Sequence, residues 1–284
     1  MLYLLLAVFS SSLVALALKF SAKKTNGTYG VYVFNYVTCF VTGFLFLEDK
    51  NLFHTPLPVV GFGAFSGFLF LASLALYQYN IQRNGTVLSA VFAKLGIILP
   101  TVLSFTVFGE TPKALQILGI LLAVAAILVI NLQKADPHAL PAEQKHNRKA
   151  ALDLIILLLV GGACDSMTKV FEFVGDRSDD DRFMFFNFFF ACIYSVFMLV
   201  KEKKIPNRYD ILFGVLLGVP NYFCTRFLLK ALTALPSFVV YPSYSVATVV
   251  VISILGRIFF KEKLNRRQLT GVGIILAALI LLNI

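Results

Sequence analysis

The sequence has 284 residues and a formal net charge of +10, yet only 14% of its residues are charged and 58% are hydrophobic. A water-soluble domain carries charged residues over roughly 25–35% of its surface, so this composition excludes a soluble globular protein. The apolar stretches that recur along the chain predict an all-α, multi-pass membrane protein.

Ten membrane-spanning helices are predicted, in two groups of five. A polar, proline-containing linker at residues 133–150 separates a first five-helix repeat (1–132) from a second (151–284). The N-terminal stretch lacks the basic region of a signal peptide, so we expect it to be the first span. The predicted spans are 2–20, 29–47, 58–80, 86–108, 113–132, 151–173, 183–200, 209–230, 237–258 and 268–284.

The two groups align with each other along the chain. Five spans are an odd number, so the second group must enter the membrane from the opposite side, which predicts an inverted-topology repeat and alternating access to a central site. The matching pairs are Glu110 with Glu262, Gly119 with Gly271, Asn131 with Asn283 and Asn35 with Asn187 at an offset of 152, and Lys19 with Lys169 at an offset of 150.

The end of each repeat resembles the EamA type of the drug/metabolite transporter superfamily. The residues that carry the resemblance are Glu110, Gln116 and Gly119 in the first repeat, and Glu262, Gln268 and Gly271 in the second. A lysine near the end of the first helix of each repeat is also typical of the family, and Lys19 and Lys169 fit it. The resemblance implies ten helices around a central substrate cavity, and termini on the cytoplasmic side.

The distribution of basic residues predicts the opposite orientation in the cell membrane. Loops on the side of the termini carry five Lys and Arg residues, and the opposite loops carry seventeen. Cytoplasmic loops are enriched in these residues, so the charge count places both termini outside.

Four ionisable side chains lie deep in the predicted spans: Lys94, Asp165, Lys169 and Arg226. A charge at the centre of a membrane helix costs at least about 2.5–3.5 kcal/mol, so each must face a partner, a cavity or water. Lys94 is either a structural tie or an anchor for a substrate carboxylate or phosphate, and Thr101 shares its helix face. Arg226 either extends toward a loop or clamps an anionic group. Counted together, the four give a surplus of two positive charges, which favours an organic anion or the carboxylate of a zwitterion.

Asp165 and Lys169 are four residues apart, the spacing at which an acid and a base pair on one helix face. They form either a structural ion pair or part of the ion coupling, together with Lys19. Asn35 and Asn187 are expected either to join helices or to contact substrate. Tyr241 and Tyr244 in the ninth span are expected on the cavity wall.

These features favour a secondary transporter of a small polar metabolite, an amino acid or organic anion. The alternatives are a multidrug or cationic-metabolite exporter of the same fold, and, outside transport, a membrane-embedded enzyme or a sensor. No nucleotide-binding loop is present, the three histidines lie in loops, and the four cysteines have no zinc spacing, so no catalytic residue, cofactor or metal is predicted. Expected partners are the substrate, the lipid bilayer and a coupling proton or sodium ion, with the protein a monomer or homodimer.

Overall fold

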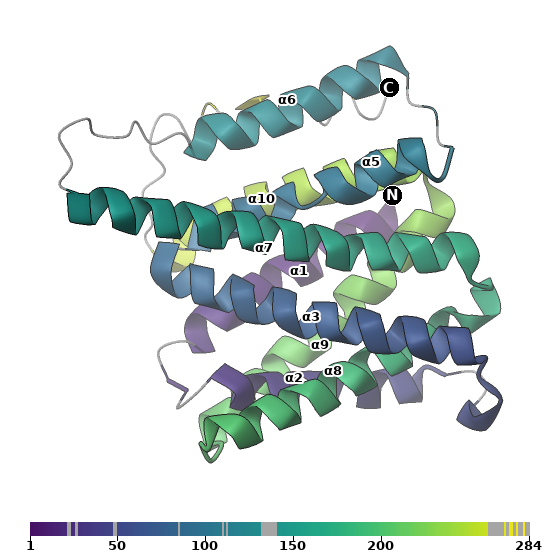
Figure 1. The fold of residues 1–284 in the computed structure, drawn as a ribbon. Coiled ribbons are helices and arrows are strands. Elements are labelled where there is room, and N and C mark those ends of the chain that lie inside the picture. The colour runs from purple at the N-terminus through teal and green to yellow at the C-terminus, as the bar shows by residue number, and fades with distance from the viewer. Residues whose placement is uncertain are drawn as a thin grey trace.

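The computed structural model of the protein is entirely helical over the residues that it describes (Figure 1). These are 1–21, 24–25, 28–47, 50–84, 86–109, 111, 113–131, 141–260 and, beyond 260, positions 270, 273–274, 277 and 281. Most of the predicted tenth span lies outside the described part, as do the residues Glu110, Glu262, Gln268, Gly271 and Asn283 and the side chain of Gln116.

Ten α-helices and two short 3₁₀ turns make up the described chain. The 3₁₀ turns are η1 (Leu52–His54) and η2 (Arg177–Asp179). The α-helices are α1 (Leu2–Ser21), α2 (Thr28–Leu45), α3 (Leu57–Asn84), α4 (Thr86–Leu95), α5 (Ile98–Thr106), α6 (Ala114–Asn131), α7 (Pro141–Val174), α8 (Asp180–Glu202), α9 (Arg208–Ala234) and α10 (Ser237–Phe260).

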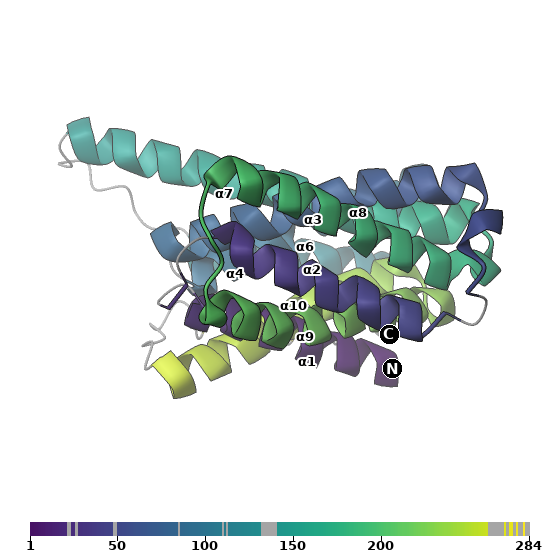
Figure 2. The same cartoon turned by 90° about the horizontal axis from the view of Figure 1, so that it is seen from below.

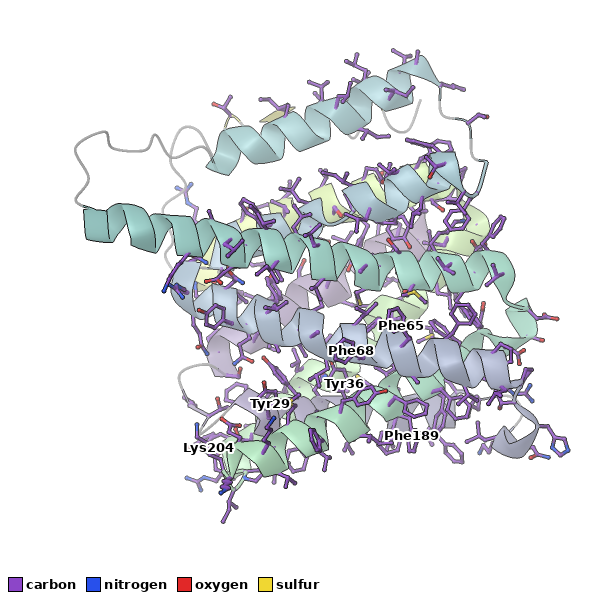
Figure 3. All side chains as sticks on the ribbon, in the orientation of Figure 1. Tyr29, Tyr36, Phe65, Phe68, Phe189 and Lys204 are labelled. Carbon is purple, nitrogen blue, oxygen red and sulfur yellow. The ribbon has the colours of Figure 1, made fainter. Side chains whose placement is uncertain are left out.

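Six of these helices are long and apolar enough to cross a membrane: α1, α3, α8, α9, α10 and the 149–174 part of α7. Shorter apolar stretches cover Tyr29–Leu45, in α2, and Phe92–Thr106, which comprises the end of α4 and all of α5. The outer faces of the long helices carry large apolar side chains, such as Phe65 and Phe68 on α3, both more than half exposed (Figure 3). In water this surface would be unfavourable, whereas lipid tails cover it without cost.

Two expected boundaries differ in the structure. The predicted fourth span, 86–108, is two helices, α4 and α5, separated at Gly96 and Ile97. Helix α7 begins at Pro141, within the predicted linker, and its first turns project beyond the bundle (Figure 2). Proline fits the first position of a helix, and the Ala-Glu-Gln-Lys that follows has high helix propensity, so a polar sequence continues the span as helix.

The helices of the two halves run in opposite directions across the bundle. In Figure 1, α1 starts at the right, where the N-terminus lies, and runs left, whereas α7 starts at the left and runs right. Helices α2 and α8 are opposed in the same way, as are α3 and α9. The largest contacts join the halves: α1 and α2 pack on α9, α2 and α3 pack on α8, and α3 packs on α7.

Two helix crossings depend on glycine. On α3, a side chain at Gly67 would overlap the carbonyl oxygen of Asn187 on α8. On α9, a side chain at Gly218 would overlap the carbonyl oxygen of Asn35 on α2. Glycine therefore allows each pair of backbones to approach closely, as small residues do between membrane helices.

The separation of α4 from α5 coincides with a third close approach. Gly96 lies between the two helices, and its backbone contacts the backbone of Gly162 on α7 so closely that a side chain on either residue would overlap the other. This contact holds the end of α4 against the middle of α7.

Candidate substrate cavity

A cavity of about 140 Å³ lies at the centre of the bundle. Seven helices contribute to its wall: α1, α2, α3, α4, α7, α9 and α10. Many lining residues lie near the middle of their helices, as Tyr36 does in α2 and Asn221 does in α9, whereas Ala93 and Lys94 lie at the end of α4. Figure 3 shows Tyr36 inside the bundle, between α3 and the α2–α8 layer. The cavity therefore lies away from both ends of the long helices that line it.

Lys94 reaches the cavity from the last turn of α4. Its Nζ lies 4.0 Å from the centre of the Tyr244 ring, an arrangement in which the ring face attracts the cation. The hydroxyl of Tyr244 lies 3.1 Å from Sγ of Cys224, and this hydrogen bond fixes the orientation of the ring. The ring thus holds an ammonium group at the cavity wall and leaves its other donors available.

Asp165 on α7 lines the same cavity. It interacts electrostatically with Lys94, but the two do not form a direct ion pair, and neither pairs with another charged group in the described part of the chain. The hydroxyl of Tyr241 donates a 2.9 Å hydrogen bond to the backbone oxygen of Asp165 and so ties α10 to α7. The cavity therefore contains one charge of each sign, set apart from each other.

Arg226 lies outside the cavity wall, in a contact between helices. Its NH1 donates to Oδ1 of Asp181 at 2.8 Å and to the hydroxyl of Tyr222 at 2.7 Å. The guanidinium also lies 4.7 Å from the centre of the Phe46 ring. These contacts tie α9 to the beginning of α8. They engage the Arg226 guanidinium, which the sequence indicates as a candidate clamp for an anionic substrate.

Lys169 pairs with Glu172, with 2.7 Å between Nζ and Oε2. Its carboxylate partner in this contact is three residues along α7, rather than the expected Asp165 four residues back. Lys19 is half-buried in the last turn of α1 and, like Lys169, is not part of the cavity wall. Because Lys169 and Arg226 both contact carboxylates elsewhere, the expected surplus of two positive charges does not occur at the cavity.

The remaining predicted residues are buried but do not line the cavity, and this includes Tyr241, which was expected on the wall beside Tyr244 but bonds to the backbone of α7 instead. Asn35 is fully buried, and its Oδ1 accepts a 3.2 Å hydrogen bond from Nδ2 of Asn221, which does reach the cavity. Asn187 and Thr101 are 1% and 3% exposed, and their side-chain polar atoms have no hydrogen-bond partner in the described part of the chain.

Several wall residues were not predicted, among them Tyr36, Tyr77, Cys164 and Asn221. Asn221 could have been found, because an amide in the middle of a span indicates an interior contact. Nothing in the sequence separates Tyr36 or Tyr77 from the many tyrosine and phenylalanine rings that pack or face lipid.

Comparison with known proteins gives a family for the second half. Residues 153–284 match the EamA-like transporter family. The chain is 23% identical over 284 residues to an uncharacterized protein of Haemophilus influenzae, covering 97% of this chain and 95% of that protein. A crystal structure that is 13% identical superposes with a TM-score of 0.73 over 99% of this chain and 94% of that one, so the two share a fold.

Proposed function

We propose that this chain, a multi-pass membrane protein whose residues 153–284 form an EamA-like transporter domain of the drug/metabolite transporter superfamily, is a secondary transporter. It moves a small polar metabolite by alternating access between two inverted five-helix repeats. The match to a family of transporters supports transport as its activity.

The observation that carries the proposal is that matching positions of the two halves line the cavity. Positions on α3 and α9 that line it are 151 residues apart: Phe70 and Asn221, Ser73 and Cys224, Leu74 and Thr225, Tyr77 and Leu228. Equivalent positions in two halves meet at one cavity when a two-fold axis passes through it. Such an axis gives two related conformations, each open to one side of the membrane.

The glycine crossings support the same symmetry. Gly67 and Gly218 are also 151 residues apart, and each lies against the backbone of an asparagine, Asn187 or Asn35, that matches the other at an offset of 152. The opposite directions of α1 and α7 in Figure 1 agree with the inversion of the second repeat.

Lys94 favours a substrate with a carboxylate, that is, an amino acid or an organic anion. Its ammonium group lies at the wall of the 140 Å³ cavity, against the Tyr244 ring, and forms no ion pair within the described part of the chain. Lys94 repels a purely cationic drug, so this residue, unlike the Asp165 carboxylate on the same wall, disfavours the multidrug alternative.

Transport can be tested by counterflow in liposomes that contain the purified chain. Liposomes preloaded with an unlabelled mixture of amino acids and small organic acids are expected to accumulate one of these compounds in labelled form from outside. The Lys94→Met variant removes the cavity charge and keeps the length of the side chain, so we expect uptake to fall at least about tenfold.

The matched control is Lys204→Met. Lys204 is half-exposed at the edge of the molecule (Figure 3), where it pairs with Glu202, so its loss leaves the cavity unchanged. The proposal is wrong if wild-type liposomes accumulate no compound of either class.

A further inference from the structure

The cavity wall is electrically balanced, and this selects among carboxylate-bearing substrates. Among the residues that the structure describes, Lys94 and Asp165 are the two charged ones on the wall, one of each sign, while Lys169 and Arg226 contact carboxylates elsewhere. We infer that the cavity binds a zwitterion, with the carboxylate of the ligand on Lys94 and its cationic group on Asp165. The inference rests on the proposed transport function and gives Asp165 a role in specificity.

The packing of α4 on α7 brings the two charges to one cavity. Gly96 and Gly162 are in backbone contact; Lys94 lies two residues before the first and Asp165 three residues after the second. The two side chains interact electrostatically without forming a direct ion pair. A ligand with a positive and a negative group can therefore contact both at once.

An ion of a single sign satisfies one of these residues and is repelled by the other. Both charges act through a mostly apolar interior, where water screens them less than at a surface. An organic anion on Lys94 would bring a second negative charge close to Asp165, and a cation on Asp165 would face Lys94. Repulsion of this kind is how a site rejects related ligands.

The neutral part of the wall indicates what the ligand carries besides its charges. Val14, Phe70, Leu74 and Tyr77 supply apolar surface. Tyr36 also lines the cavity, and its buried hydroxyl has no hydrogen-bond partner in the described part of the chain. This surface fits an apolar or aromatic side chain on the zwitterion.

The test compares ligands that differ in one charge. Alanine, leucine and phenylalanine are each paired with an N-acetyl form, which lacks the positive charge, and an amide form, which lacks the negative charge. Binding to the purified full chain is measured as the rise in unfolding temperature with ligand concentration. All four cysteines are buried, so a fluorogenic thiol reagent reports unfolding.

We expect at least one zwitterion to bind wild type at least about tenfold more tightly than both of its analogues. Asp165→Asn keeps the shape of the side chain and removes its charge, so it is expected to weaken the zwitterion at least about tenfold and to remove the preference over the N-acetyl form. Lys94→Met is expected to remove the preference over the amide form. Lys204→Met is the control and leaves all affinities unchanged.

Three results would overturn the inference: no zwitterion binds, an N-acetyl form binds wild type as tightly as its parent, or Asp165→Asn weakens all three forms equally. Liposome counterflow separates these results from a failure of transport. If an organic anion binds and is carried, the transport proposal holds and the zwitterion inference fails. If a zwitterion binds selectively but is not carried, the recognition holds and transport fails.

Discussion

At the scale of single residues, depth in the membrane and contact with the cavity are separate properties. Lys94 and Arg226 both lie within apolar stretches, and sequence identifies both as charges that need partners. Lys94 reaches the cavity, whereas Arg226 contacts Asp181 on a neighbouring helix. Sequence could not predict this difference, because Asp181 is 45 residues away in the chain, and the two meet only because α8 and α9 both pack on α2.

Substitution of Arg226 distinguishes a structural tie from a substrate clamp. The Arg226→Met variant leaves Asp181 and Tyr222 without their shared donor, and we expect it to lower the free energy of unfolding by about 1–3 kcal/mol. The double variant with Asp181→Asn is expected to lose less than the two single variants added together, because it leaves no unpaired charge. Thermal unfolding measures both, and a drop in ligand affinity with unchanged stability would contradict the tie.

At the scale of helices, sequence predicts where a membrane span lies more reliably than whether that span is one continuous helix. Most predicted spans coincide with a helix, because length and apolar character define them. The separation of α4 from α5 was missed, since a glycine in an apolar stretch is compatible with a continuous helix. The close approach of Gly96 to Gly162 distinguishes this position, and that contact depends on a helix from the other half.

The glycine crossings predict that an added methyl group lowers stability at Gly67 and Gly218 but not at a glycine with open space around it. The Gly67→Ala and Gly218→Ala variants place a side chain against a neighbouring backbone, so we expect each to lower stability by about 1–3 kcal/mol. Gly61→Ala on the same helix as Gly67 is the control, because no atom lies within 4 Å of its added carbon. Equal unfolding temperatures for Gly61→Ala and Gly67→Ala would show that the α3–α8 crossing is not this close.

At the scale of the whole molecule, the sequence repeat predicts that equivalent positions of the two halves line one cavity, but it does not predict the offset that pairs them. Pairs identified by sequence differ by 150 or 152 residues, whereas the wall positions on α3 and α9 differ by 151. Loops of unequal length shift the offset from one helix to the next, so only spatial contact gives the correct pairs.

The loop charges predict the orientation of the molecule in the membrane, with both termini outside. We expect Asp176, between α7 and η2, to face outside and Lys204, between α8 and α9, to face the cytoplasm. In intact cells, a membrane-impermeant thiol reagent should label Asp176→Cys and not Lys204→Cys. The native cysteines are buried and give little background. Labelling of Lys204→Cys alone would show that the family orientation, with cytoplasmic termini, applies instead.

The packing of α3 on α7 and α8, and of α1 and α2 on α9, means that neither half completes a core by itself. The third helix of each half, α3 or α9, packs on the first two helices of the other half. The two halves are therefore intertwined and not docked side by side. One half synthesised alone would expose these helix contact surfaces to lipid. Two halves synthesised separately together contain all the contact surfaces that assembly needs. An ancestor in which two copies of one five-helix chain joined in opposite orientations is compatible with this architecture.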